Sequence, residues 1–142
     1  MIVLPRAVVT HIAEAAEAAY PDECCGLLVG RAEASGDRLV SRAAASPNVA
    51  EGNTRDSFLV DPKIQFDLMR ELGNGPECII GHYHSHPHHG AVPSERDRRS
   101  VFYPEHVWVI VAVDEGRAGD MTAHLFDAGR GRFREIPLRV TG

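Results

Sequence analysis

The run of apolar residues from Val107 to Val113 (VWVIVAV) constrains the fold of this chain more than any other feature. A strand places successive side chains on opposite faces, and in this run both faces are apolar. Such a strand is typical of the centre of a sheet that other layers cover on both sides. The sequence therefore predicts a layered α/β domain.

Patterns along the rest of the chain predict helices interleaved with strands. An apolar stripe at helical spacing indicates a helix over residues 6–20, and Asp61-Pro62 before a second stripe indicates a helix that ends at Gly73. A short helix is expected from Ser94 to about residue 102. The remaining apolar segments predict strands over residues 23–30, 38–45, 78–84, 107–113, 122–127 and 133–140, with a loop over 85–93. Because no linker divides the chain, we expect a single domain over residues 1–142.

Charge and cysteine content exclude several classes of protein. The chain has 15 Lys+Arg against 20 Asp+Glu, a net charge of −5, and shows no dominant basic face of the kind that nucleic-acid binding requires. No apolar run has the length of a membrane helix, and the N-terminus does not resemble a secretion signal. Cys24 and Cys25 are adjacent, which is poor geometry for a mutual disulfide. These features favour small buried thiols, Cys78 among them, in a reducing cytoplasm.

Five of the eight histidines fall within eight consecutive positions, and this cluster points to chemistry. His84 and His86 have the spacing of one strand face and can converge on an ion, while Asp97 lies one turn into the next helix. Two imidazoles and a carboxylate suit zinc, and three protein ligands leave a fourth position for water, as in catalytic sites. A competing interpretation needs no metal, because Ser94 and Asp97 also fit a capping box that follows a polar loop.

The order of these residues resembles the signature of the JAMM (MPN-type) zinc metallopeptidases, in particular their compact stand-alone bacterial members. The resemblance rests on His84-Ser-His86-Pro followed by Ser94 and Asp97, and on Pro21–Gly30, which is similar to the family's first-strand Glu motif. It covers essentially the whole chain. It implies an α/β/α sandwich of the JAMM/MPN type (cytidine-deaminase-like) with a mixed central sheet.

The resemblance also implies a role for each residue of the motif. His84, His86 and Asp97 match the ligands of one zinc ion, with water as the fourth ligand. Glu23 matches the general base that takes a proton from that water, and Ser94 matches the residue that stabilises the oxyanion. Without the resemblance, Glu23 is interpreted as an ordinary exposed glutamate at a helix–strand junction.

The implied activity is zinc-dependent hydrolysis of the amide bond after the C-terminal Gly-Gly of a ubiquitin-like sulfur-carrier protein. The polar loop over residues 46–56 is the candidate guide for the carrier's tail. Two alternatives remain: a zinc amidohydrolase acting on a small or short peptide amide, and a non-catalytic scaffold of the same fold. A homodimer is left open.

The remaining histidines of the cluster receive weaker interpretations. His82 is expected to be packed or hydrogen-bonded in the core, with a role as third ligand in place of Asp97 as the alternative. His88 and His89 are expected to be solvated loop residues, with substrate contact or a second, weaker metal site as the alternative.

Overall fold

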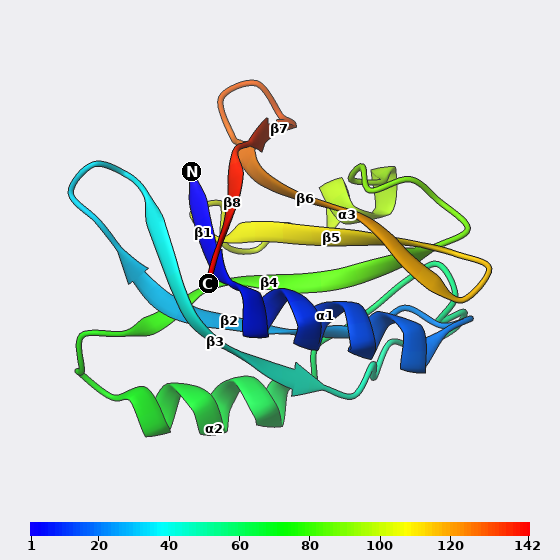
Figure 1. Ribbon diagram of the computed structural model, residues 1–142, viewed down its shortest axis with the longest axis horizontal. Helices are drawn as coiled ribbons and strands as arrows, with labels where there is room; N and C mark the ends of the chain where they lie inside the picture. The colour runs from blue at the N-terminus through cyan, green and yellow to red at the C-terminus, as the bar shows by residue number, and fades with distance from the viewer.

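The computed structural model describes residues 1–142 and contains one mixed eight-stranded sheet in the order β7-β6-β5-β4-β2-β3-β1-β8 (Figure 1). The predicted mixed α/β architecture is confirmed. The strands are β1 (Ile2–Pro5), β2 (Cys25–Ala32), β3 (Arg38–Ser46), β4 (Cys78–Pro87), β5 (Val107–Asp114), β6 (Arg117–Asp127), β7 (Arg132–Ile136) and β8 (Leu138–Thr141). The helices are α1 (Arg6–Ala19), α2 (Pro62–Leu72) and α3 (Glu95–Arg99).

The apolar run 107–113 forms β5, which lies in the interior of the sheet as predicted. β5 pairs in parallel with β4 and antiparallel with β6, so it has a strand neighbour on each side. Residues 107–111 are buried on both faces of the sheet. The continuous apolar pattern therefore reflects cover by both flanking layers.

Helices α1 and α2 pack on opposite faces of the sheet. On one face, Ile12 and its neighbours in α1 join the main core around Tyr83. On the other face, Leu68 of α2 packs against Leu27 and Val29 of β2. Leu27 lies opposite His82 in the antiparallel β2–β4 pair, so the even-numbered histidines of β4 lie on the α2 face.

The signals for the ends of α2 act as predicted. The Asp61 carboxylate accepts a hydrogen bond from the amide of Lys63, and Pro62 occupies the first helical position. The helix ends where Gly73 adopts a φ of +52°. Because α2 begins at Pro62, the preceding residues 57–61 lie on the same face of the sheet as α2, beside the histidines of β4.

The loop expected over residues 85–93 begins later than predicted, because β4 continues to Pro87. Residues 85–87 pair with residues 111–113 of β5, and this parallel neighbour keeps the strand extended beyond His84. His86 is therefore held by the sheet rather than by a loop.

The segment 133–140, predicted as one strand, forms two strands, β7 and β8, at opposite edges of the sheet. β7 pairs with β6 and β8 pairs with β1, with Pro137 between them. Proline has no backbone N–H to donate, so a continuous ladder is interrupted there. The pairing partner β1 was not predicted from the sequence.

Smaller corrections concern element ends and one thiol. β6 begins at Arg117 rather than near residue 122, and α3 ends at Arg99 rather than near residue 102. Cys24 and Cys25 are buried as expected, whereas Cys78 is exposed at the start of β4. None of the three helices combines the length and the apolar character that crossing a bilayer requires.

Candidate metal centre

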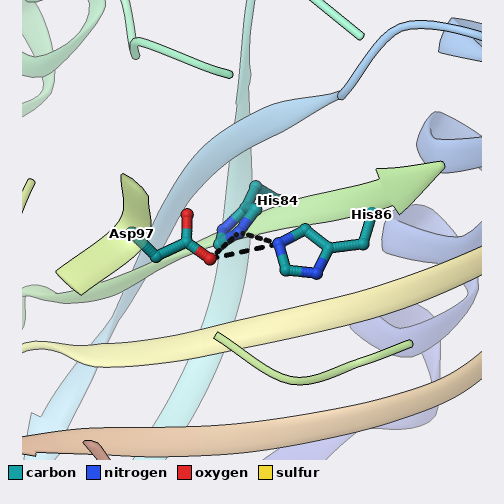
Figure 2. A group of neighbouring side chains, drawn as sticks. All are labelled: His84, His86 and Asp97. Carbon is teal, nitrogen blue, oxygen red and sulfur yellow. Dashed lines mark hydrogen bonds and ion pairs between the residues drawn. The ribbon is translucent and has the colours of Figure 1, made fainter. Parts of the chain in front are cut away.

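Three predicted ligands converge at the end of β4. The Nε2 atoms of His84 and His86 lie 3.0 Å apart, and Asp97 Oδ2 lies 3.3 Å from the first and 3.1 Å from the second. Figure 2 shows the two imidazoles of β4 and the carboxylate of α3 pointing toward one another. All three side chains are buried. The structure thus brings together two residues of one strand and a third from the following helix.

These distances and protonation states fit a metal ion. In a tetrahedron with bonds of about 2.0 Å, neighbouring ligand atoms lie about 3.3 Å apart, close to the spacing found here. His86 Nδ1 lies 3.0 Å from the carbonyl oxygen of Gly90, to which it donates its proton, so Nε2 presents a lone pair to the cluster. Burial lowers the pKa of His84, which favours the neutral imidazole that binds metals. Burial also acts to lower the pKa of His86, but Asp97 and the carbonyl of Gly90 outweigh burial and raise it, so this buried site favours a positive charge, which a metal ion can supply.

The start of α3 aims the carboxylate of Asp97 at the histidines. The Ser94 hydroxyl accepts from the amide of Asp97 at 3.0 Å, and Asp97 Oδ2 accepts from the amide of Ser94 at 2.9 Å. Burial alone would raise the pKa of Asp97, but the contacts with the His84 and His86 rings and the hydrogen bond from this amide outweigh burial and hold the pKa well below its ordinary value. The capping box and the ligand cluster therefore coexist, and the two interpretations of Asp97 do not compete.

Glu23 lies just before β2 and lines the same cleft as His86. Its side chain is 3% exposed, and Oε1 is buried without a hydrogen-bond partner. Its backbone is fixed to the loop after β3, because its amide donates to the carbonyl of Thr54 and Asn48 donates to its carbonyl. Burial raises the pKa of Glu23 to about 8. The interpretation as an exposed surface glutamate is wrong, and the buried oxygen is available for a ligand.

The cleft lined by Glu23, His86 and Ser94 has a volume of about 510 Å³. Ser94 is exposed at its rim, where its oxygen caps α3 while its hydroxyl proton stays free to donate. The other lining side chains that bear charge or an imidazole are Glu23, Asp56, His86, His89, Glu95, Arg96 and Arg99. The cleft is therefore polar and is large enough for a short extended peptide.

An aromatic wall that the sequence analysis did not predict supports His84. Phe58, from the segment before α2, stacks on the His84 ring with centroids 4.2 Å apart, and Trp108 of β5 contacts His82 edge-on. The β-bridge between Asn48 and Val60 holds this segment in place. No local pattern in the sequence indicates a contact between this segment and the histidines.

Replacing Phe58 with alanine is expected to lower the free energy of unfolding by about 2 kcal/mol, below the ~3–5 kcal/mol typical of a fully buried phenylalanine, because this ring is half-buried. Loss of the stack also frees the His84 ring to turn, so zinc affinity should fall. Chemical denaturation and a zinc titration with a competing chelator measure the two effects. Phe58→Tyr keeps the ring and should retain both properties, and unchanged zinc affinity in Phe58→Ala would contradict the supporting role.

The other histidines lie outside the ligand cluster. His82 is half-buried between Phe58 and Trp108, with Nε2 lacking a partner, in agreement with a packed position. His88 and His89 are exposed, and His88 Nε2 lies 3.2 Å from the hydroxyl of Tyr20. The structure therefore groups only three side chains as potential metal ligands.

With this geometry established, comparison with known proteins identifies the family. The family of prokaryotic homologs of the JAB domain matches residues 5–126. The chain belongs to this family. The resemblance to the JAMM (MPN-type) proteins is thereby confirmed, and the His-His-Asp cluster is the place where a JAB-family chain would hold its metal.

Individual relatives support the same assignment. A protein from Haloferax volcanii named desampylase is 32% identical over 133 residues, which cover 94% of this chain and 88% of that protein. A solution structure from Desulfitobacterium hafniense is 26% identical, with a TM-score of 0.85 over 99% of this chain and 93% of that one. A JAB1/MPN domain protein from Archaeoglobus fulgidus, 23% identical, has a TM-score of 0.63 over the whole of both chains, which shows the shared fold.

Proposed function

We propose that this JAB-family chain is a zinc-dependent hydrolase that cleaves the amide bond after the C-terminal Gly-Gly of a ubiquitin-like sulfur-carrier protein. The observation that carries the proposal is the ligand trio His84, His86 and Asp97 beside a buried glutamate with an unpartnered oxygen. A scaffold without catalysis has no need to keep such a carboxyl buried, since burial without a partner costs free energy.

His84, His86 and Asp97 would hold the zinc ion. When bound, zinc lowers the pKa of a water molecule toward neutrality and polarises a carbonyl group. Glu23 accepts a proton from that water and passes it to the departing amine, a task suited to a carboxyl whose pKa lies near the working pH. The hydroxyl of Ser94 donates to the oxygen on which negative charge develops.

The proposed substrate class rests on the relative and on the cleft. The Haloferax volcanii protein is, by its name, an enzyme that removes a ubiquitin-like modifier. From the loop over residues 46–56, Asp56 lines the wall of the cleft, and the carbonyl of Thr54 accepts a hydrogen bond from the amide of Glu23. A Gly-Gly tail has no side chains, so it can pass such a wall in extended form and present its carbonyl to the ligand trio. We propose that this loop guides the tail.

The test uses a recombinant ubiquitin-like sulfur-carrier protein that carries one extra residue after Gly-Gly, with short acylated amides as the comparison. We expect the chain to hydrolyse the carrier, to lose this activity when a chelator is added and to regain it with zinc. Mass spectrometry of the products follows the reaction. Hydrolysis of the short amides at equal kcat/KM would instead indicate a small-amide hydrolase. Failure to cleave any amide with zinc bound would contradict the proposal.

Replacing Ser94 with alanine is expected to lower kcat by about 100-fold, because one oxyanion donor is lost, while zinc is retained. Removal of the α3 cap should also cost about 1 kcal/mol of stability. Ser94→Asp separates the two roles, since aspartate can cap the helix but has no proton to donate, and Ser94→Thr should restore both. An effect on KM alone would move Ser94 from the transition state to substrate binding.

A further inference from the structure

Two arginines that the proposed reaction does not use line the cleft. Arg96 and Arg99 lie three residues apart on α3, which places them on one side of the helix, and both line the cavity that also contains Glu23 and His86. Neither side chain forms an ion pair, whereas Arg98, on the same helix, is bound to Glu95 at 2.5 and 3.0 Å. The two guanidinium groups are therefore free to bind an anion.

The acidic side chains of the cleft leave the two arginines unpaired. Three of them share the cavity with the arginines: Glu23, Asp56 and Glu95. Glu95 is paired with Arg98, and neither Glu23 nor Asp56 forms an ion pair with Arg96 or Arg99. A planar guanidinium matches a carboxylate in geometry, and two of them can hold both of its oxygens.

The position of Glu23 tells which part of a substrate meets the arginines. Glu23 must lie within hydrogen-bond reach of the amide nitrogen that it protonates, so the amine side of the scissile bond lies next to Glu23. Arg96 lines the same cavity as Glu23, and together with His86 it opposes the effect of burial on the pKa of Glu23. The acyl side ends in Gly-Gly and bears no charge. An anion at Arg96 and Arg99 therefore belongs to the amine side.

We propose that Arg96 and Arg99 bind the free α-carboxylate of a single amino acid joined through its α-amine to the carrier's Gly-Gly. This specificity rests on the proposed function. In such a substrate the carboxylate is separated from the scissile nitrogen by one carbon atom, so it falls next to Glu23. A lysine side chain in an isopeptide conjugate presents only uncharged methylenes there. Hydrolysis breaks the C–N bond, the water oxygen enters the carrier's new carboxylate, and both water protons end on the released amine.

The test compares two carrier proteins that differ in one group. Both are extended by one alanine beyond Gly-Gly, one with a free carboxylate and one with a C-terminal amide. For the wild-type chain we expect kcat/KM to be about 10- to 100-fold higher for the carboxylate form, the range that charge-assisted hydrogen bonds supply. Arg96→Gln/Arg99→Gln should lower kcat/KM for the carboxylate form by this factor and so abolish the preference. Arg70→Gln/Arg139→Gln removes the same charge from exposed sites outside the cleft and should keep the preference.

Binding to the zinc-loaded Glu23→Gln chain provides a readout that needs no turnover. We expect the carboxylate carrier to bind more tightly than the amide carrier by a similar factor, and the added arginine substitutions to remove the difference. Equal hydrolysis and equal binding of the two carriers overturn the arginine proposal while leaving the function intact. Selective binding without any hydrolysis by wild type overturns the function and leaves the carboxylate site standing.

Discussion

Replacing Glu23 with glutamine is expected to lower kcat by about 10²- to 10⁴-fold while one zinc per chain is retained, because glutamine keeps the shape and cannot carry the proton. Glu23 is not among the three converging ligands, so metal content should not change. Steady-state hydrolysis of the extended carrier and elemental mass spectrometry measure the two quantities.

Asp56→Asn is the matched control for this experiment. It removes a carboxylate from the same cleft without touching the proposed proton path, so kcat should stay within a few-fold of wild type. Activity of Glu23→Gln within tenfold of wild type would exclude Glu23 as general base. Loss of zinc in this variant would instead make Glu23 a ligand.

The same substitution has a predictable effect on the metal-free protein. Burial raises the pKa of Glu23 from 4.5 to about 8, so between these values the folded chain keeps a proton that the unfolded chain has released. The free energy of unfolding therefore falls as the pH rises through this window, and the loss is complete above about pH 8. Glu23→Gln lacks this contribution. The free energy of unfolding of the wild type, measured by denaturation in chelator, should therefore fall between pH 5 and pH 8 relative to that of the variant.

Replacing His84 with alanine is expected to abolish zinc binding, the second large effect. The substitution removes one of three ligands and leaves Asp97 in a buried site with a single imidazole. Because the three side chains converge only in the folded chain, the variant should also lose the stabilisation that the proposed zinc ion would give, up to about 4 kcal/mol when free zinc is a thousandfold above its dissociation constant. Thermal unfolding with and without chelator should differ for wild type and coincide for the variant.

His89→Ala serves as the comparison for His84→Ala. His89 is exposed at the rim of the cleft and does not belong to the ligand trio, so the variant should keep one zinc and the full thermal shift. A measured zinc content near two per chain in wild type, falling to one in His89→Ala, would establish the second, weaker metal site that the histidine cluster left open.

Local patterns indicated that His84, His86 and Asp97 could converge, and the family resemblance assigned them as ligands. Period-two spacing puts His84 and His86 on one strand face, and a capped helix that starts soon after aims Asp97 back at them. The same local signals predicted α2 with its two ends and the interior position of β5. In each case the determining contacts join residues that are close in sequence or share one continuous pattern.

Contacts between distant segments could not be predicted in this way. Glu23 reaches the histidines because Cys25 pairs with His84 across two antiparallel strands, and no local pattern gives that register. Family resemblance supplied the role of Glu23, but not its burial or the stack of Phe58 on His84. The division of the last strand at Pro137 was missed for a similar reason, since the partners of β7 and β8 lie in different parts of the chain.

The parallel pairing of β1 with β8 places the first and last strands of the chain side by side (Figure 1). During synthesis, Ile2–Pro5 must therefore wait for Leu138–Thr141 to leave the ribosome, while every group of the metal centre lies within the first 97 residues. Joining ends so far apart has a large loop-closure entropy, which makes this step late. We expect a nascent chain to bring His84, His86 and Asp97 together before β1 and β8 pair, so that this edge of the sheet is the last part to form.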